Sequence, residues 1–100
     1  MTLRHVVMWK MAAEDAGERA RHAAEAADRL RALEGVVPSI RAISAGPNTL
    51  YPDANWDLVL VADFDDVAGL DAYQGHPAHQ EVVAYVRSVV ASRAAVDIEL

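Results

Sequence analysis

The sequence of 100 residues contains no cysteine, and this absence excludes disulfide bonds, thiolate nucleophiles and thiolate metal ligands. A secreted fold that depends on disulfides is therefore excluded as well. Positive charge is scarce, because nine lysine and arginine residues stand against 15 aspartate and glutamate residues, for a formal net charge of −6. An excess of negative charge repels phosphate groups, so neither nucleic acid nor an anionic membrane is expected as a partner.

Long apolar runs are also missing. No stretch approaches the roughly 18 consecutive apolar residues that a membrane span needs, and Arg4, His5 and Lys10 interrupt the first apolar segment. We therefore expect neither a membrane span nor an apolar leader. Hydrophobic residues nevertheless make up 53% of the chain, which is enough to build one core. The sequence predicts a single soluble cytoplasmic domain over residues 1–100.

The expected elements follow the order β-α-β-β-α-α-β along the chain. Strands are expected at residues 3–11, 39–46, 56–64 and 95–100, and helices at residues 14–34, from 65 or 66 to about 74, and 77–93. This order is typical of the split βαβ, ferredoxin-like α+β fold with a four-stranded antiparallel sheet.

Two of the expected strands, 3–11 and 56–64, are apolar on both faces. In the second of them, Leu58 and Leu60 alternate with Val59 and Val61. The helices can cover only one face of a four-stranded sheet, and a bare apolar face would be a large exposed patch. A second copy of the chain is the most economical cover. The sequence therefore predicts a homodimer that associates through its sheet faces.

The segment YQGHPAHQEVV at residues 73–83 places two of the four histidines close together. His76 precedes Pro77, and the α region is disfavoured for a residue before proline. His76 is therefore expected at the N-cap of the third helix. The main interpretation of His76 is structural, either setting the entry angle of the chain or capping a backbone N–H.

His79 lies on an apolar stripe of the third helix. The residues of this stripe, at helical spacing, are His79, Val82, Val83, Val86 and Val90. Its ring is expected to point inward, where burial and the positive end of the helix both disfavour the protonated imidazole. A neutral imidazole can accept a proton, so His79 is a candidate general base. The alternative is a core histidine with a purely structural hydrogen bond.

Tyr73 follows Leu70 by three residues, so both are expected on the inner face of the short helix. Its hydroxyl could bind a substrate oxygen or the His79 imidazole, whereas a buried tyrosine more commonly donates to a carbonyl. If the face of the first strand that carries His5 meets the helices, His5 points to the same interior. Three imidazoles would suffice in number for a zinc site. However, the break before Pro77 interrupts helical spacing and no carboxylate completes a ligand set, so no metal site is expected.

Six segments in order resemble the stress-responsive dimeric α/β-barrel (Dabb) family over nearly the whole chain. They read RHVVMWK, LEGVVPSI, AGPN, WDLVLVADF, YQGHPAHQEVV and AAVDIEL. Within this family the chain is similar to the olivetolic acid cyclase-type polyketide cyclases at His5, Tyr73 and His79. The resemblance implies a ferredoxin-like subunit whose sheet meets a partner's sheet in a closed barrel, with a pocket between helices and sheet.

The same resemblance implies an intramolecular aldol condensation without metal or organic cofactor, with His79 as base, Tyr73 as its assistant and His5 nearby. The expected ligand is a small hydrophobic or aromatic molecule. Candidate substrate-binding residues are Trp9, Leu30, Asp57, Val82 and Val86. Two alternatives stay open: a non-catalytic stress-associated or ligand-binding dimer, and a cofactor-free monooxygenase-like enzyme.

At two of these positions the chain departs from the cyclases. Asp57 stands where they have a histidine, and Leu30 stands where they have a tyrosine.

Overall fold

Four strands form one antiparallel sheet in the order β2-β3-β1-β4 in the computed structural model, which describes residues 1–100. The strands are β1 (Leu3–Met11), β2 (Ala42–Pro47), β3 (Leu58–Phe64) and β4 (Val90–Glu99). The helices are α1 (Ala16–Arg31), α2 (Val67–Gly75) and α3 (Pro77–Val89). The predicted ferredoxin-like α+β fold is confirmed.

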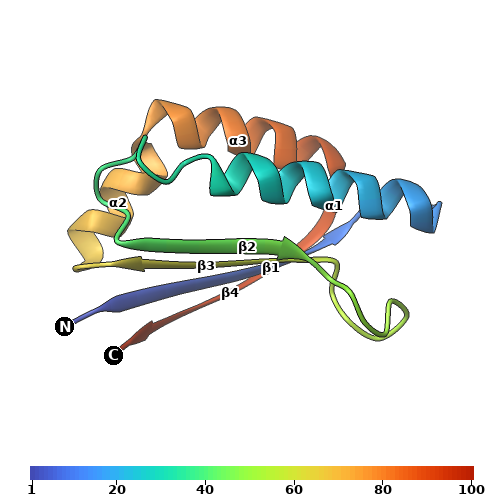
Figure 1. Ribbon diagram of the computed structural model, residues 1–100, viewed down its shortest axis with the longest axis horizontal. Helices are drawn as coiled ribbons and strands as arrows, with labels where there is room; N and C mark the ends of the chain where they lie inside the picture. The colour runs from blue at the N-terminus through green and yellow to red at the C-terminus, as the bar shows by residue number, and fades with distance from the viewer.

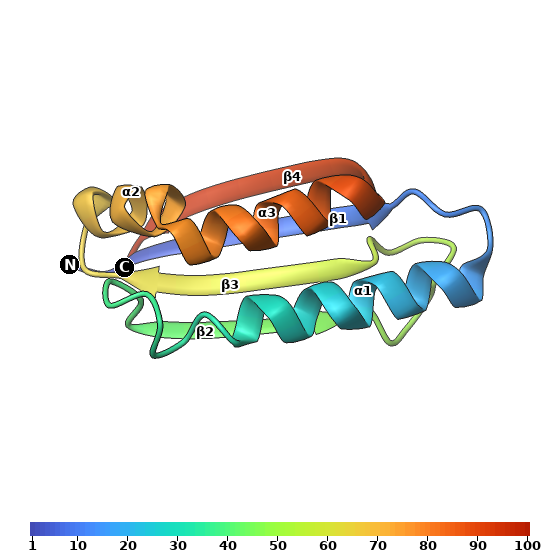
Figure 2. The ribbon, with the colours of Figure 1, turned by 90° about the horizontal axis from the view of Figure 1, so that it is seen from above.

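All three helices lie on the same side of the sheet (Figure 1). Viewed from above, α1 runs over β2 while α3 runs along the β1 side (Figure 2). The core fills the layer between them, and its largest fully buried side chains include Tyr73, Phe64, Leu58, Leu60 and Val7. None of the helices combines the length and the apolar character that crossing a membrane requires.

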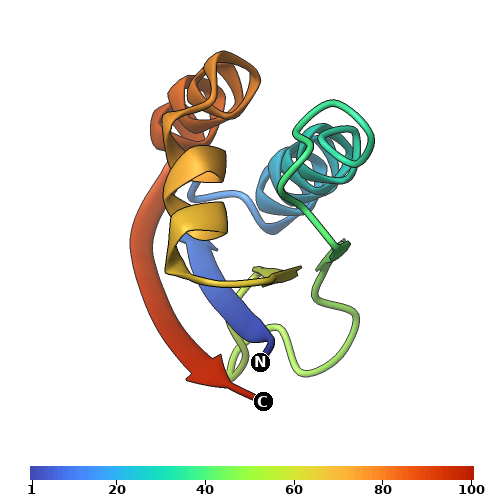
Figure 3. The same ribbon diagram turned by 90° about the vertical axis from the view of Figure 1, so that its left-hand side faces the viewer.

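The opposite side of the sheet is left uncovered by the chain's own helices (Figure 3). There Val6 pairs with Val61 on one side and with Val96 on the other, and Met8 pairs with Val59. Val96 is 60% exposed, and Met8 and Val59 are each 38% exposed. The two-sided apolar pattern is thus confirmed. We refer to this surface, formed by Val6, Met8, Val59, Val61, Val96 and Ile98, as the open face.

Aspartate side chains cap the starts of the first two helices. The Asp15 carboxylate accepts a hydrogen bond from the Glu18 N–H at 2.9 Å, and the Asp66 carboxylate accepts one from the Gly69 N–H at 2.9 Å. Helix α1 is shorter than the predicted range of 14–34. A turn follows Arg31, and Gly35 in this turn adopts a positive φ of 82°, which an L-residue adopts only with strain.

The boundary between α3 and β4 differs from the prediction of a helix to residue 93 and a strand from residue 95. Helix α3 ends at Val89 and β4 begins at Val90. The cause is tertiary, because β4 pairs with β1 along its whole length, from Leu3↔Glu99 to Met11↔Val90. These inter-strand hydrogen bonds and the β-branched valine outweigh the helical pattern. Helix and strand are joined directly, without a loop.

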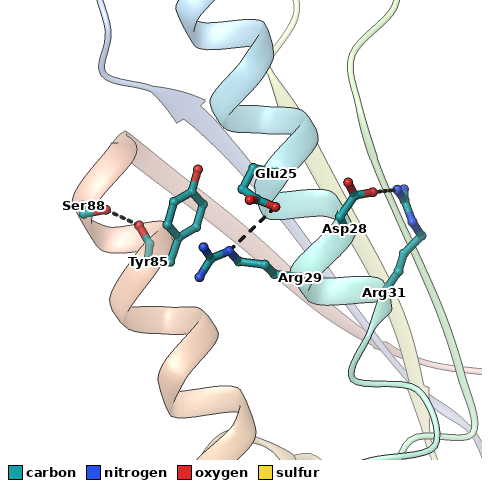
Figure 4. A network of polar contacts seen from close by, with 6 residues as sticks. All are labelled: Glu25, Asp28, Arg29, Arg31, Tyr85 and Ser88. Atoms are coloured by element: carbon teal, nitrogen blue, oxygen red, sulfur yellow. Dashed lines mark hydrogen bonds and ion pairs between the residues drawn. The ribbon is translucent and has the colours of Figure 1, made fainter.

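Helices α1 and α3 are held together by a polar contact on their outer surfaces (Figure 4). The Arg29 guanidinium lies 4.0 Å from the centroid of the Tyr85 ring, and its Nε is 3.8 Å from the Glu25 carboxylate. The Ser88 hydroxyl donates to the Tyr85 carbonyl at 2.5 Å. The contact of Arg29 with Tyr85 helps to fix α3 against α1.

Candidate functional site

A cavity of about 510 Å³ lies beneath α3 on the helix-covered side of the sheet. Seven of the eight residues predicted for the site line this one cavity. They are His5 and Trp9 from β1, Leu30 from α1, Tyr73 from α2, and His79, Val82 and Val86 from α3. The structure therefore brings together three polar rings and an apolar wall from four separate elements.

Asp57 is the predicted site residue that the structure does not bring into the cavity. Its carboxylate accepts a hydrogen bond from the Met11 N–H at 2.8 Å, and its own N–H donates to the Trp9 carbonyl at 2.9 Å. Asp57 thus extends the pairing of β1 with the chain just before β3. Its contacts stabilise the sheet.

Tyr73 is fully buried at the end of α2, and its ring packs between Phe64 and His79. The ring centroids are 5.1 Å from Phe64 and 4.2 Å from His79. Its hydroxyl makes no hydrogen bond with any atom of the chain, so the common arrangement with a carbonyl acceptor is not found. Burial raises the pKa of Tyr73 to about 12, against a smaller opposing effect of the Arg93 charge. At neutral pH the phenol is therefore a hydrogen-bond donor without an acceptor in the chain.

His79 is half-buried in the first turn of α3. Its Nδ1 lies 3.2 Å from the Gln74 carbonyl oxygen. A carbonyl can only accept a hydrogen bond, so Nδ1 carries the proton and Nε2 keeps a lone pair. Burial is the main cause that lowers the pKa of His79; the hydrogen bond to Gln74 opposes this, and the positive charges of nearby groups, including Arg93, add to it. The ring is a neutral base at physiological pH.

His5 is buried and paired with a residue that the sequence did not single out. Its Nδ1 lies 2.6 Å from a carboxylate oxygen of Asp97 on β4. The carboxylate accepts the hydrogen bond, so the proton of this contact lies on Nδ1 and Nε2 is left for other partners. The His5 and Tyr73 ring centroids are 6.5 Å apart. The alternation of Val96 and Ile98 in the last strand could have placed Asp97 on the inner face, but its partner depended on the strand register.

His76 has the structural role that was its main interpretation. It is the N-cap of α3, and its Nδ1 accepts a hydrogen bond from the Ala78 N–H at 3.1 Å. It does not line the cavity. No three histidine, aspartate or glutamate side chains gather in a cluster that could hold a metal ion.

A four-stranded antiparallel sheet in the order β2-β3-β1-β4, with all three helices on one side, defines an α+β protein of the ferredoxin-like class. The model of the stress-responsive A/B barrel domain matches residues 3–100. The chain therefore belongs to the stress-responsive A/B barrel (Dabb) family.

Solved structures show the same fold over nearly the whole chain. A dimeric protein of ferredoxin-like fold from Bacteroides fragilis is 26% identical, with 99% of this chain and 96% of that chain covered and a TM-score of 0.89. A dimeric ferredoxin-like protein from Thermobifida fusca is also 26% identical, with coverage of 100% and 92% and a TM-score of 0.83.

A hydroxynitrile lyase from Passiflora edulis is 11% identical, with coverage of 97% and 91% and a TM-score of 0.75. At this identity the likeness concerns the fold alone. Among curated proteins, none matches the sequence.

Proposed function

We propose that the cavity is a cofactor-independent acid–base site that acts on a carbonyl compound, in the manner of a polyketide cyclase. The observation that carries this proposal is the buried Tyr73 hydroxyl, which lacks an acceptor within the chain and belongs to a ring 4.2 Å from that of His79. A buried hydroxyl without a partner costs about 1–3 kcal/mol in a folded protein. A substrate oxygen that accepts from Tyr73 would remove this cost.

The two rings supply complementary halves of an aldol step. The Nε2 lone pair of His79 takes a proton from the carbon next to a carbonyl, and the resulting enolate carbon forms a bond to a second carbonyl carbon of the same molecule. Tyr73 donates a hydrogen bond to the oxygen on which negative charge develops. The His79 imidazolium then returns the proton to the new alkoxide. The net reaction is an intramolecular carbon–carbon bond formation that leaves the enzyme unchanged.

The rest of the cavity supports a small, mostly apolar substrate. Ten of the 17 lining residues are hydrophobic, and Trp9, Leu30, Val82 and Val86 are all buried. Apolar walls exclude water and strengthen each hydrogen bond inside the cavity. His5, fixed by Asp97, adds a second acceptor nitrogen that can bind a hydroxyl of the substrate.

A second copy of the chain is the proposed cover of the open face. Three solved proteins that are 26–27% identical to this chain are described as dimeric. Exposed valine and isoleucine side chains on the open face support the same assembly. Two sheets packed in this way would form the barrel of the Dabb family and leave the cavity on the outer, helical side.

The test is cyclisation of a 3,5,7-trioxoacyl N-acetylcysteamine thioester, followed by mass spectrometry of the product. His79→Gln should lower the rate at least about 100-fold, because the base is removed while a side chain of similar size remains. His76→Asn is the matched control, since it replaces the neighbouring histidine, keeps a capping side chain and lies outside the cavity. Turnover by His79→Gln at the parent rate would exclude the assigned base.

The other candidate functions give different results in the same assay. A non-catalytic ligand-binding dimer would bind the thioester and release it unchanged. A monooxygenase-like enzyme would give a product that contains oxygen from ¹⁸O₂.

A further inference from the structure

The eight arginine side chains differ in whether they have a partner within the chain. Four of the eight arginines pair with carboxylates, namely Arg4 with Asp63, Arg29 with Glu25, Arg31 with Asp28, and Arg41 with Asp65. Figure 4 shows two of these pairs. Arg19 donates to two backbone carbonyls at 2.7 and 2.9 Å. Arg21, Arg87 and Arg93 make no ion pair and no hydrogen bond through their side chains.

Two of these three unpaired arginines line the cavity. Arg87 lies near the end of α3, and Arg93 lies on β4 opposite Trp9. No aspartate or glutamate is among the 17 lining residues. In a chain with a net charge of −6, acidic partners for these two guanidinium groups are plentiful elsewhere on the surface. Two unpaired cations at one mostly apolar cavity therefore form a local field opposite in sign to that of the whole chain.

The charge of Arg93 reaches both rings of the candidate site. Burial is the main cause that lowers the pKa of His79, and the Arg93 charge lowers it further. For Tyr73, burial raises the pKa and the Arg93 charge acts against it. An anionic group of a ligand that sits at Arg93 would thus lie within electrostatic range of the groups to which we assign the chemistry.

We propose that the ligand of this cavity is a small organic acid whose carboxylate binds Arg93 and Arg87 while its apolar body packs against Trp9, Leu30 and Val82. A guanidinium group binds a carboxylate through two parallel hydrogen bonds, which also fixes the orientation of the ligand. This inference rests on the proposed function of the same cavity and names its preferred substrates as carbonyl compounds that also bear a carboxylate. The uncharged trioxoacyl thioester supplies the reacting carbonyl groups without this anchor.

The experiment compares 4-propylbenzoate with 4-propylbenzamide by isothermal titration calorimetry on the full chain. The two probes have nearly the same shape and differ in charge. The acid should bind at least about tenfold more tightly than the amide at low ionic strength, and less so at high ionic strength. Arg93→Gln should remove most of this preference, Arg87→Gln part of it, and Arg93→Lys should retain some of it.

Arg21→Gln is the matched control, because it removes the same charge from another exposed, unpaired arginine, on α1 and outside the cavity lining. It should leave the preference unchanged. The inference is overturned if acid and amide bind equally, if neither binds, or if Arg21→Gln weakens acid binding as much as Arg93→Gln does. Binding is measured without turnover, so loss of the charge preference would leave the His79 assay untouched, and a failed His79 assay would leave the binding result intact.

Discussion

The rings of Tyr73 and His79 are in contact, with centroids 4.2 Å apart and planes tilted by 47°, although the two residues belong to different helices. In one continuous helix, residues six positions apart would point in different directions. The extended backbone of His76, with φ −68° and ψ 136°, separates α2 from α3 and lets both rings face the same cavity. The proline at position 77 enforces this break. The chemistry that we assign to the pair therefore depends on a helix interruption.

Tyr73→Phe should stabilise the protein and weaken its function. The ring contacts with Phe64 and His79 remain, while a buried hydroxyl without a partner is removed, so the free energy of unfolding should rise by about 1 kcal/mol. The cyclisation rate should fall by about tenfold or more, because the donor to the developing oxyanion is lost. Urea unfolding and the thioester assay measure the two effects. Tyr85→Phe, in a tyrosine that packs against Arg29 outside the cavity, should change neither, and a destabilised Tyr73→Phe would show that the hydroxyl has a partner.

The rate should depend on the protonation of His79. Its pKa lies below the ordinary value of 6.5, chiefly because of burial, so the active neutral form persists to lower pH. The rate should therefore rise with pH to a plateau, with its midpoint below 6.5. Arg93→Gln should move the midpoint upward, because one positive charge that disfavours the imidazolium is removed. A midpoint above 6.5 in the parent protein would contradict the lowered pKa of His79.

Asp97 should act as a positioning residue for His5. Asp97→Ala removes the acceptor of the Nδ1 proton and should cost about 1 kcal/mol of stability, since the carboxylate is partly exposed. Ring ¹⁵N chemical shifts of His5 should then show a mixture of tautomers in place of one. Asp97→Asn keeps an acceptor oxygen and should restore the single tautomer. If the alanine variant retains one tautomer, Asp97 does not orient the ring.

Val96→Glu should dissociate the proposed dimer. Val96 is 60% exposed at the open face, and a carboxylate buried there between two apolar sheets would lack a compensating partner. The dissociation constant should increase at least about tenfold, as measured by analytical ultracentrifugation. Val67→Glu is the control, because Val67 is 56% exposed at the start of α2, away from the sheet. A parent protein that is monomeric at micromolar concentration would exclude the dimer.

The fold could be predicted from the sequence because its signals are local. The β-prone residues 3–11, proline at 77 and an aspartate cap at 65 or 66 each indicate an element without reference to its neighbours, and the structure has the cap at Asp66. The predicted boundary between α3 and β4 was wrong because residues 90–93 become a strand by pairing with β1, which is remote in sequence. Helical and strand patterns are both compatible with that short stretch.

The candidate site, like the fold, could be predicted from the sequence only where its signals are local. The inward faces of His79 and the valines of α3 followed from periodicity, whereas that of His5 depended on which face of β1 meets the helices. The structure brings all of them to one cavity. The contact between His5 and Asp97 could not be read from the sequence, because it requires the exact register of two strands at opposite ends of the chain. The same holds for Asp57, whose hydrogen bond to the Met11 N–H depends on the position of a neighbouring strand.

The direct junction of α3 and β4 limits how this site can diversify. Residues 77–99 form one uninterrupted segment that carries His79 at its start and Arg93 and Asp97 farther along. With no loop between the helix and the strand, an insertion or deletion at Val89–Val90 would rotate one set of side chains relative to the other and shift the whole strand against β1. Length changes are better accommodated in the exposed connection between β2 and β3. New specificities in this cavity should therefore arise by substitution of individual lining residues, while this part of the chain keeps a constant length.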